Sequence, residues 1–251
     1  GAFKGLANGS AWIGDPGDAA SMENARLVRW ALSMAIDRQK IVDTVLGGFG
    51  ETAYVASNIT PDRPEFNEEW RVPYDIAGAK QKLIDAGYPE GFEITLWSAC
   101  NLPAIWDCEI ADAVGEMWIT NLGLDVTVDH ADYAVRRPES VNKEMNTPWL
   151  HGIAWLPGQS IANFYCAHPG HLGGVTLPDD TCATGKLNDV EPDMDKRLAN
   201  NASMTEYMSH WQTQSAIATV GNYFIYSSKI VEWRPYMTGY FNSAETIVLS
   251  E

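Results

Sequence analysis

Residues 24–46 read NARLVRWALSMAIDRQKIVDTVL, and GGFG follows directly at residues 47–50. Apolar side chains recur near helical spacing in this stretch, at Leu27, Ala31, Met34, Ala35, Val42, Val45 and Leu46. Asn24 is a suitable N-cap because its side chain can accept a hydrogen bond from the first turn. Two consecutive glycines favour an end to the helix. The pattern therefore predicts one amphipathic helix over residues 24–46.

The chain that follows alternates helical and strand patterns. An irregular connection with three prolines over residues 49–74 leads to YDIAGAKQKLIDAGYPEGFEITLW at residues 74–97. Asp75 is a suitable N-cap and Gly87 a suitable stop, so a helix is expected over 75–86. The further elements expected are a strand over 92–97, a helix over 105–122 and a strand over 124–128. Interleaved helices and strands of this kind predict an α/β fold with βαβ units.

The C-terminal half gives shorter and more local signals. Pro138 is expected to interrupt a helical stretch, because proline lacks the backbone N–H. Residues 203–206, SMTE, form a capping-box pattern that predicts the start of a helix. Short runs of apolar and aromatic residues predict strands over 151–155, 223–226 and 231–233.

Three stretches carry a resemblance to a known family. VRWALSMAIDR at 28–38, YDIAGAKQKLIDAGYPEGF at 74–92 and NLGLDVTVDHADY at 121–133 are similar to segments of the extracellular solute-binding proteins of family 5, the peptide/nickel type. Members of that family capture ligands for ABC importers. The resemblance implies a fold like that of type II periplasmic binding proteins, with this chain forming one lobe in which helices flank a mixed sheet.

The resemblance also implies a division of the chain and a function. Residues 1–23 would be a crossing or hinge segment from an N-terminal lobe that is largely missing. Residues 24–220 would form the ligand-binding lobe, and residues 221–251 would hold strands returning toward the hinge. The implied function is non-covalent capture of a small solute (a peptide, a sugar or a similar compound) for an ABC permease, without a cofactor. A monomeric, periplasmic or extracellular protein is expected, and lipid anchoring of the full-length protein is an open alternative.

The resemblance places the ligand contacts in AWLPGQSIANF, residues 154–164. The residues expected to bind ligand are Trp155, Gln159, Ser160 and Asn163. Peptide binders of the family carry an aspartate in this loop for the ligand's α-ammonium, whereas residues 156–162 here contain no acid. A buried ammonium without a counter-charge is costly, so the loop favours a neutral polar ligand held by stacking and hydrogen bonds. The alternative is that Trp155 belongs to the core and the loop is only a connector.

The four cysteines form two local pairs, Cys100 with Cys108 and Cys166 with Cys182. Two short disulfides are the economical interpretation for an exported protein. Free thiols are one alternative, and a metal site with His168 and His171 is another. The spacing lacks the tight C-x2-C pair that is usual in zinc sites, so no metal site is expected.

Composition and motifs argue against several other functions. The 251 residues carry 17 Lys and Arg against 33 Asp and Glu, and the resulting net charge of −16 repels nucleic acid and anionic lipid. No apolar run approaches the ~20 residues of a membrane-spanning helix. The sequence has no G-x-S-x-G, H-E-x-x-H or phosphate-loop motif, and its five histidines are scattered, so no enzyme activity is expected. The rivals that stay open are a hydrolase and a stand-alone interaction domain that kept the lobe fold without ligand capture.

Overall fold

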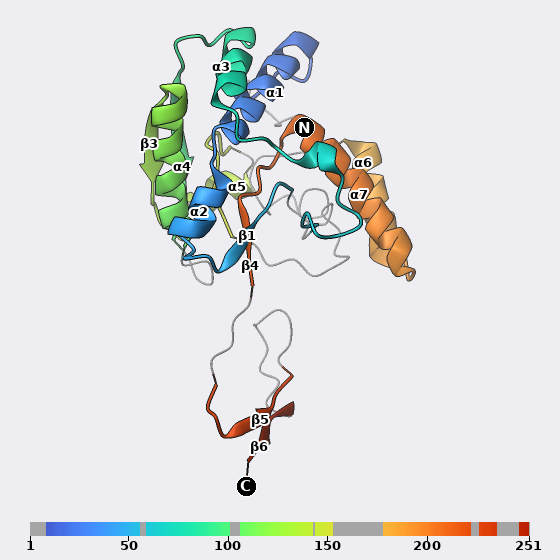
Figure 1. Ribbon diagram of the computed structural model, residues 1–251. Helices are drawn as coiled ribbons and strands as arrows, with labels where there is room; N and C mark the ends of the chain where they lie inside the picture. The colour runs from blue at the N-terminus through green and yellow to red at the C-terminus, as the bar shows by residue number, and fades with distance from the viewer. Residues whose placement is uncertain are drawn as a thin grey trace.

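The computed structural model describes residues 9–55, 59–100, 106–142, 144–152, 178–221, 226–234 and 246–250 (Figure 1). Its helices are α1 Ala19–Met34, α2 Arg38–Thr44, α3 Ile76–Asp85, α4 Asp107–Leu122, α5 Tyr133–Val141, α6 Asp179–Val190 and α7 Met194–Trp211, with a 3-10 helix, η1, at Glu68–Trp70. Its strands are β1 Gly50–Thr52, β2 Glu93–Trp97, β3 Asp125–Asp129, β4 Ala218–Val220, β5 Ile230–Glu232 and β6 Val248–Leu249. The fold is α/β, as predicted. Within the described ranges the strands pair into three small sheets, one parallel and two antiparallel.

The first predicted helix is two helices in the structure. The carboxylate of Asp18 accepts hydrogen bonds from the first turn of α1, so this helix begins earlier than expected and Asn24 lies inside it. α1 ends at Met34, and the side chain of Asp37, just before α2, accepts a hydrogen bond from the backbone N–H of Lys40 at 3.0 Å. This second cap starts α2 in the middle of the apolar pattern. The prediction of one helix over 24–46 was therefore wrong.

Three other helices meet the C-terminal end of α1. An α-helix leaves its last four carbonyl groups without partners in the helix, and in α1 these belong to the buried residues 32–35. Each of the four carbonyls accepts a hydrogen bond from a different residue. The pairs are Trp118 Nε1 to Leu32 (2.9 Å), Arg38 Nη1 to Ser33 (3.0 Å), the Asp75 backbone N to Met34 (3.1 Å) and Asn121 Nδ2 to Ala35 (2.9 Å). The end of α1 is thereby tied to α2, to the start of α3 and to α4.

Arg38 connects the same region to the β1–β4 sheet. Its side chain is buried, and its Nε donates to the carbonyl oxygens of Ala53 (3.1 Å) and Ala216 (2.9 Å), which lie close to β1 and β4 in the chain. Its Nη2 donates to the hydroxyl of Ser33 at 2.8 Å. Burial lowers the pKa of Arg38 to about 10, so the guanidinium still carries its charge at neutral pH. One side chain therefore joins two helices to two antiparallel strands that are far apart in sequence.

The unit β2–α4–β3 is a parallel βαβ unit, as predicted. β2 and β3 pair in register along their whole length, and α4 is the connection between them. α4 lies so close to β3 that a Cβ added at Gly115 would be 2.6 Å from a methyl group of Val128. The helix ends at Gly123, whose φ of 74° lies in the left-handed region that favours glycine. Because the two strands are parallel, both end at the same edge of the sheet.

Two predictions about later helices were wrong. Pro138 lies inside α5, where it removes only one backbone hydrogen bond, and Arg136 holds this helix to the end of β3 through Asp129 at 2.6 Å. The capping-box pattern at 203–206 lies within α7. That helix begins at Met194 because the side chain of Asp193 accepts hydrogen bonds from its first turn.

The strands predicted near the C-terminus were confirmed only in part. β5 matches the strand expected at 231–233, and it pairs with β6. These two strands lie apart from the helices in Figure 1, close to the C-terminus. Of the strand expected at 223–226, only Tyr226 belongs to the described residues. Of the strand expected at 151–155, only His151 and Gly152 belong to them. β4 was not predicted.

Replacing Gly115 by alanine should destabilise the protein although alanine is the better helix former. Overpacking against Val128, at about 1–3 kcal/mol, should outweigh a gain in helix propensity of ~1 kcal/mol. Urea unfolding of the wild type, Gly115→Ala, Val128→Ala and the double variant measures the effect. In the Val128→Ala background the Gly115→Ala change should no longer reduce stability. An equal loss in both backgrounds would contradict the packing of α4 on β3.

Candidate functional site

The edge where β2 and β3 end brings three segments of the chain together. The backbone N–H of Ser98, just beyond β2, donates to the carbonyl of Asp129 at the end of β3 (2.9 Å). Trp149 forms a parallel bridge with Trp97, and the N–H of Leu150 donates to the Trp97 carbonyl (2.8 Å). Ligands of open α/β sheets bind outside the carboxyl ends of the strands. This edge is therefore the candidate functional site.

Stacked aromatic rings form one side of the edge. The ring centroid of Trp149 lies 4.7 Å from that of Trp97, 4.5 Å from that of His151 and 5.9 Å from that of Tyr133. Trp97 is fully buried, and its Nε1 donates to the carbonyl of Ala131 at 2.8 Å. The Trp149 Nε1 is buried too and has no hydrogen-bond partner within the described ranges. Aromatic rings present large contact areas to flat or apolar groups.

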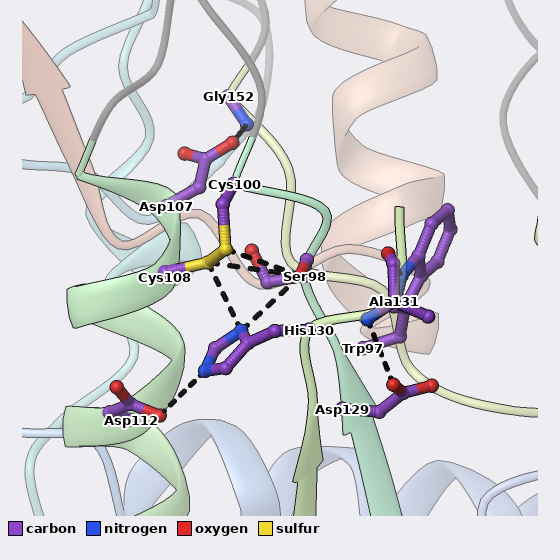
Figure 2. The surroundings of a disulfide bond; sticks show 10 residues. All are labelled: Trp97, Ser98, Cys100, Asp107, Cys108, Asp112, Asp129, His130, Ala131 and Gly152. Carbon is purple, nitrogen blue, oxygen red and sulfur yellow. Dashed lines mark hydrogen bonds and ion pairs between the residues drawn. A yellow bond between two sulfur atoms is a disulfide. The ribbon is translucent and has the colours of Figure 1, made fainter. Parts of the chain in front are cut away.

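A cluster of a disulfide, an imidazole and a carboxylate lies on the other side of the edge (Figure 2). Cys100 and Cys108 are joined in a disulfide, as predicted. Nδ1 of His130 lies 3.0 Å from the sulfur of Cys108, and Nε2 of the same ring lies 3.0 Å from a carboxylate oxygen of Asp112. The carbonyl oxygen of Ser98 lies 3.3 Å from Nδ1 of His130. These residues come from the end of β2, the first turns of α4 and the residue after β3.

Asp107 fixes the chain where it leaves this edge. It is the first residue of α4 and is 8% exposed, and its carboxylate accepts a hydrogen bond from the backbone N–H of Gly152 at 2.8 Å (Figure 2). Burial raises the pKa of Asp107 to about 6, and the hydrogen bond from Gly152 counteracts part of that rise. Gly152 is the last described residue before 153–177, the segment in which the ligand contacts were predicted.

The predicted ligand residues Trp155, Gln159, Ser160 and Asn163 all lie within 153–177, outside the described residues. Cys166 lies there as well, so its pairing with Cys182 stays a prediction. The same holds for the alternative metal site with the histidines at positions 168 and 171.

The sequence analysis missed His130, Asp112, Ser98 and the aromatic stack around Trp149. A signal for two of them was present, because Ser98 directly follows the strand predicted over 92–97 and His130 lies two residues after the strand predicted over 124–128. In a parallel βαβ unit such residues share an edge. Asp112 and Trp149 reach the edge through the packing of α4 and through the bridge to Trp97, and neither contact has a local sequence signal.

The fold is that of type II periplasmic binding proteins. The model for bacterial extracellular solute-binding proteins, family 5 middle, matches residues 18–166, and the chain belongs to this family. Its members are periplasmic or extracellular solute-binding proteins rather than enzymes. No helix in the described part of the chain has both the length and the apolar character needed to cross a membrane.

Curated relatives and solved structures agree with this assignment. The glutathione-binding protein GsiB of Salmonella typhimurium is 40% identical over 75 residues, which are 30% of this chain and 14% of GsiB. Heme-binding protein A of Haemophilus influenzae is 38% identical over 88 residues, which are 35% of this chain and 16% of that protein. The oligopeptide-binding protein AppA of Bacillus subtilis, solved with a nonapeptide, shares the fold with a TM-score of 0.67 at 17% identity, over 90% of this chain and 48% of AppA. DppA of Helicobacter pylori, solved with the peptide STSA, gives a TM-score of 0.61 at 20% identity, over 78% of this chain and 38% of DppA. The chain thus spans less than half the length of these solved proteins.

Removing the charge of Asp107 should stabilise the protein at neutral pH. Because the pKa of about 6 in the fold lies above the value near 3.9 of an unfolded aspartate, the fold favours the neutral carboxyl. This group's contribution to the free energy of unfolding therefore falls as the pH rises from about 4 to about 6. Asp107→Asn keeps an oxygen for the Gly152 N–H, so it should gain roughly 1–2 kcal/mol at pH 7 and lose that gain below pH 4.

Urea unfolding between pH 4 and pH 8 measures this difference. Glu109→Gln is the matched control, because Glu109 lies in the same helical turn and is exposed. The control should change stability by no more than about 0.5 kcal/mol at any of these pH values. A pH-independent difference between Asp107→Asn and the wild type would contradict the raised pKa.

Proposed function

We propose that the chain supplies one wall of a solute-binding cleft in the substrate-binding component of an ABC importer. The observation that carries the proposal is the edge at the ends of β2 and β3, where the aromatic stack includes His151, close in sequence to the predicted ligand-binding loop. Edges of this kind are where α/β sheets bind ligands. Membership of family 5 supports solute capture as the activity and an ABC permease as the partner. We further propose a monomer that works in the periplasm or outside the cell.

The proposed ligand is a small organic solute that presents a neutral polar face to this wall. Trp155 would stack on it, while Gln159, Ser160 and Asn163 would donate and accept hydrogen bonds. Relatives with names such as glutathione-binding and di/tripeptide-binding protein support a peptide-like compound, and a sugar is the other candidate class. Since 156–162 hold no acid, a ligand's ammonium group would need its counter-charge from another part of the cleft.

The 251-residue chain alone should bind such a solute weakly. Pockets for small molecules normally bury most of the ligand surface, and one wall would leave a large part of it in water. A loss of several kcal/mol would change micromolar affinity to millimolar or weaker, at about 1.4 kcal/mol for each tenfold step. Calorimetric titration of the chain with a neutral disaccharide, a dipeptide and reduced glutathione measures the affinity.

Matched variants connect the weak binding to the proposed residues. Trp155→Ala should weaken it about tenfold, the effect of losing one good stacking contact. Trp233→Ala is the control, since Trp233 follows β5, which lies far from the edge in Figure 1. Submicromolar one-to-one binding by the chain would contradict the single-wall proposal. Equal affinities for the wild type and Trp155→Ala would contradict the proposed ligand contacts.

A further inference from the structure

Three potential metal-ligand atoms meet beside the edge, and solute capture does not use them. The sulfurs of Cys100 and Cys108 and the imidazole nitrogen of His130 lie within 4.8 Å of one another. They come from the residues after β2, from the first turn of α4 and from the residue after β3 (Figure 2). The spacing of the cysteine pairs had argued against zinc, because it lacks a tight C-x2-C pair, and the sequence did not show His130 as a further ligand beside Cys100 and Cys108. The parallel pairing of β2 and β3 provides that ligand.

The orientation of the imidazole suits a metal ligand. Nε2 of His130 lies 3.0 Å from the carboxylate of Asp112, an acceptor only, so this nitrogen carries the proton. Nδ1 is the nitrogen left for a metal ion, and it lies 3.0 Å from the sulfur of Cys108 and 3.3 Å from the carbonyl oxygen of Ser98. A carboxylate behind the far nitrogen of a histidine is the arrangement that orients histidine ligands at metal sites.

Ser98 adds a carbonyl oxygen and a hydroxyl group to the same place. Its carbonyl oxygen lies 3.9 Å from the sulfur of Cys100, 3.8 Å from that of Cys108 and 3.3 Å from Nδ1 of His130. Its hydroxyl is fully buried and has no hydrogen-bond partner within the described ranges. Buried hydroxyl groups are rarely left unsatisfied. A metal ion bound by Cys100, Cys108 and His130 would have a fourth position for a water molecule. That water could form hydrogen bonds with the carbonyl and the hydroxyl oxygen of Ser98.

We propose that Cys100, Cys108 and His130 form a binding site for a thiophilic d10 metal ion, Zn²⁺, when the Cys100–Cys108 disulfide is reduced. In a tetrahedral site with Zn–S bonds of about 2.3 Å and a Zn–N bond of about 2.0 Å, the ligand atoms lie roughly 3.5–3.8 Å apart. The sulfurs therefore separate from the roughly 2 Å of an S–S bond to about 3.8 Å. The Cα atoms of the two cysteines lie 5.1 Å apart, which leaves room for that separation by side-chain rotation.

The reduction and the binding are separate, balanced steps. A dithiol gives two electrons and two protons to the S–S bond and becomes a cyclic disulfide, while Cys100 and Cys108 become thiols. Zn²⁺ then displaces one proton from each thiol to the buffer as two Zn–S bonds form. Asp112 adds negative charge 3.0 Å from the imidazole of His130, and the chain carries a net charge of −16. These charges oppose free thiolates and favour a bound cation.

Cobalt(II) titration of the full chain tests the site, because tetrahedral Co²⁺ with thiolate ligands shows sulfur-to-metal charge-transfer and strong d–d absorption. The Cys166→Ser/Cys182→Ser variant serves as the background, so that Cys100 and Cys108 are the only two of the four cysteines left. After reduction by a dithiol and its anaerobic removal, the protein should bind one Co²⁺ with these bands, and Zn²⁺ should abolish them. The oxidised protein should show neither band.

Single changes assign the ligands. His130→Gln and Asp112→Asn should each weaken binding by about 10–100-fold, whereas His210→Gln, an exposed histidine on α7, should leave it unchanged. In a second comparison, Cys166 and Cys182 are kept, and Cys100→Ser/Cys108→Ser should remove the bands from the reduced chain. Absence of charge-transfer bands in the reduced background protein, or binding equally tight in His130→Gln, would overturn the proposal.

Discussion

The four carbonyl groups at the end of α1 that the helix itself cannot pair are the constraint on which the rest of the described fold depends. A helix cannot satisfy these groups itself, and residues 32–35 are buried, so water cannot satisfy them either. The protein brings a donor to each of them from α2, from the start of α3 and from α4. Unpaired buried carbonyls are expensive. The positions of these helices around α1 are therefore fixed by hydrogen bonds as well as by apolar packing.

The candidate site follows from the same constraint. α4 is fixed to α1 by Trp118 and Asn121, and it connects the two parallel strands whose ends form the edge. Its first turns then carry Asp107 to Gly152 and Cys108 to His130. The contacts between α4 and α1 support the βαβ unit, and Asp107, Cys108 and His130 lie at the end of the unit where β2 and β3 stop. This separation is what a binding protein requires, since precise sites need support from packed elements.

Sequence predicted those parts of the fold that have local physical causes. The helix over 75–86 and the strands over 92–97 and 124–128 were confirmed with small shifts, because Asp75, Gly87 and apolar alternation act within a few residues. The prediction over 24–46 failed because the Asp37 cap interrupts an apolar pattern that continues across it. The candidate site was harder, because His130 meets Cys108 only through strand pairing. The loop motif lies outside the described residues, and no local pattern could reveal the aromatic stack formed by the Trp97–Trp149 bridge.

The free energy of unfolding of Arg38→Met, compared with that of Arg63→Met, tests the central role of the α1 end most directly. Arg38 is buried and bonded to carbonyls of three segments, whereas Arg63 is exposed. Removal of Arg38 takes a buried donor from each of these carbonyls, of which Ser33 keeps a 3.3 Å hydrogen bond from the Ile36 N–H, so the variant should lose at least about 2 kcal/mol. Arg63→Met should stay within about 0.5 kcal/mol of the wild type. A loss for Arg38→Met no larger than that of its control would contradict the account.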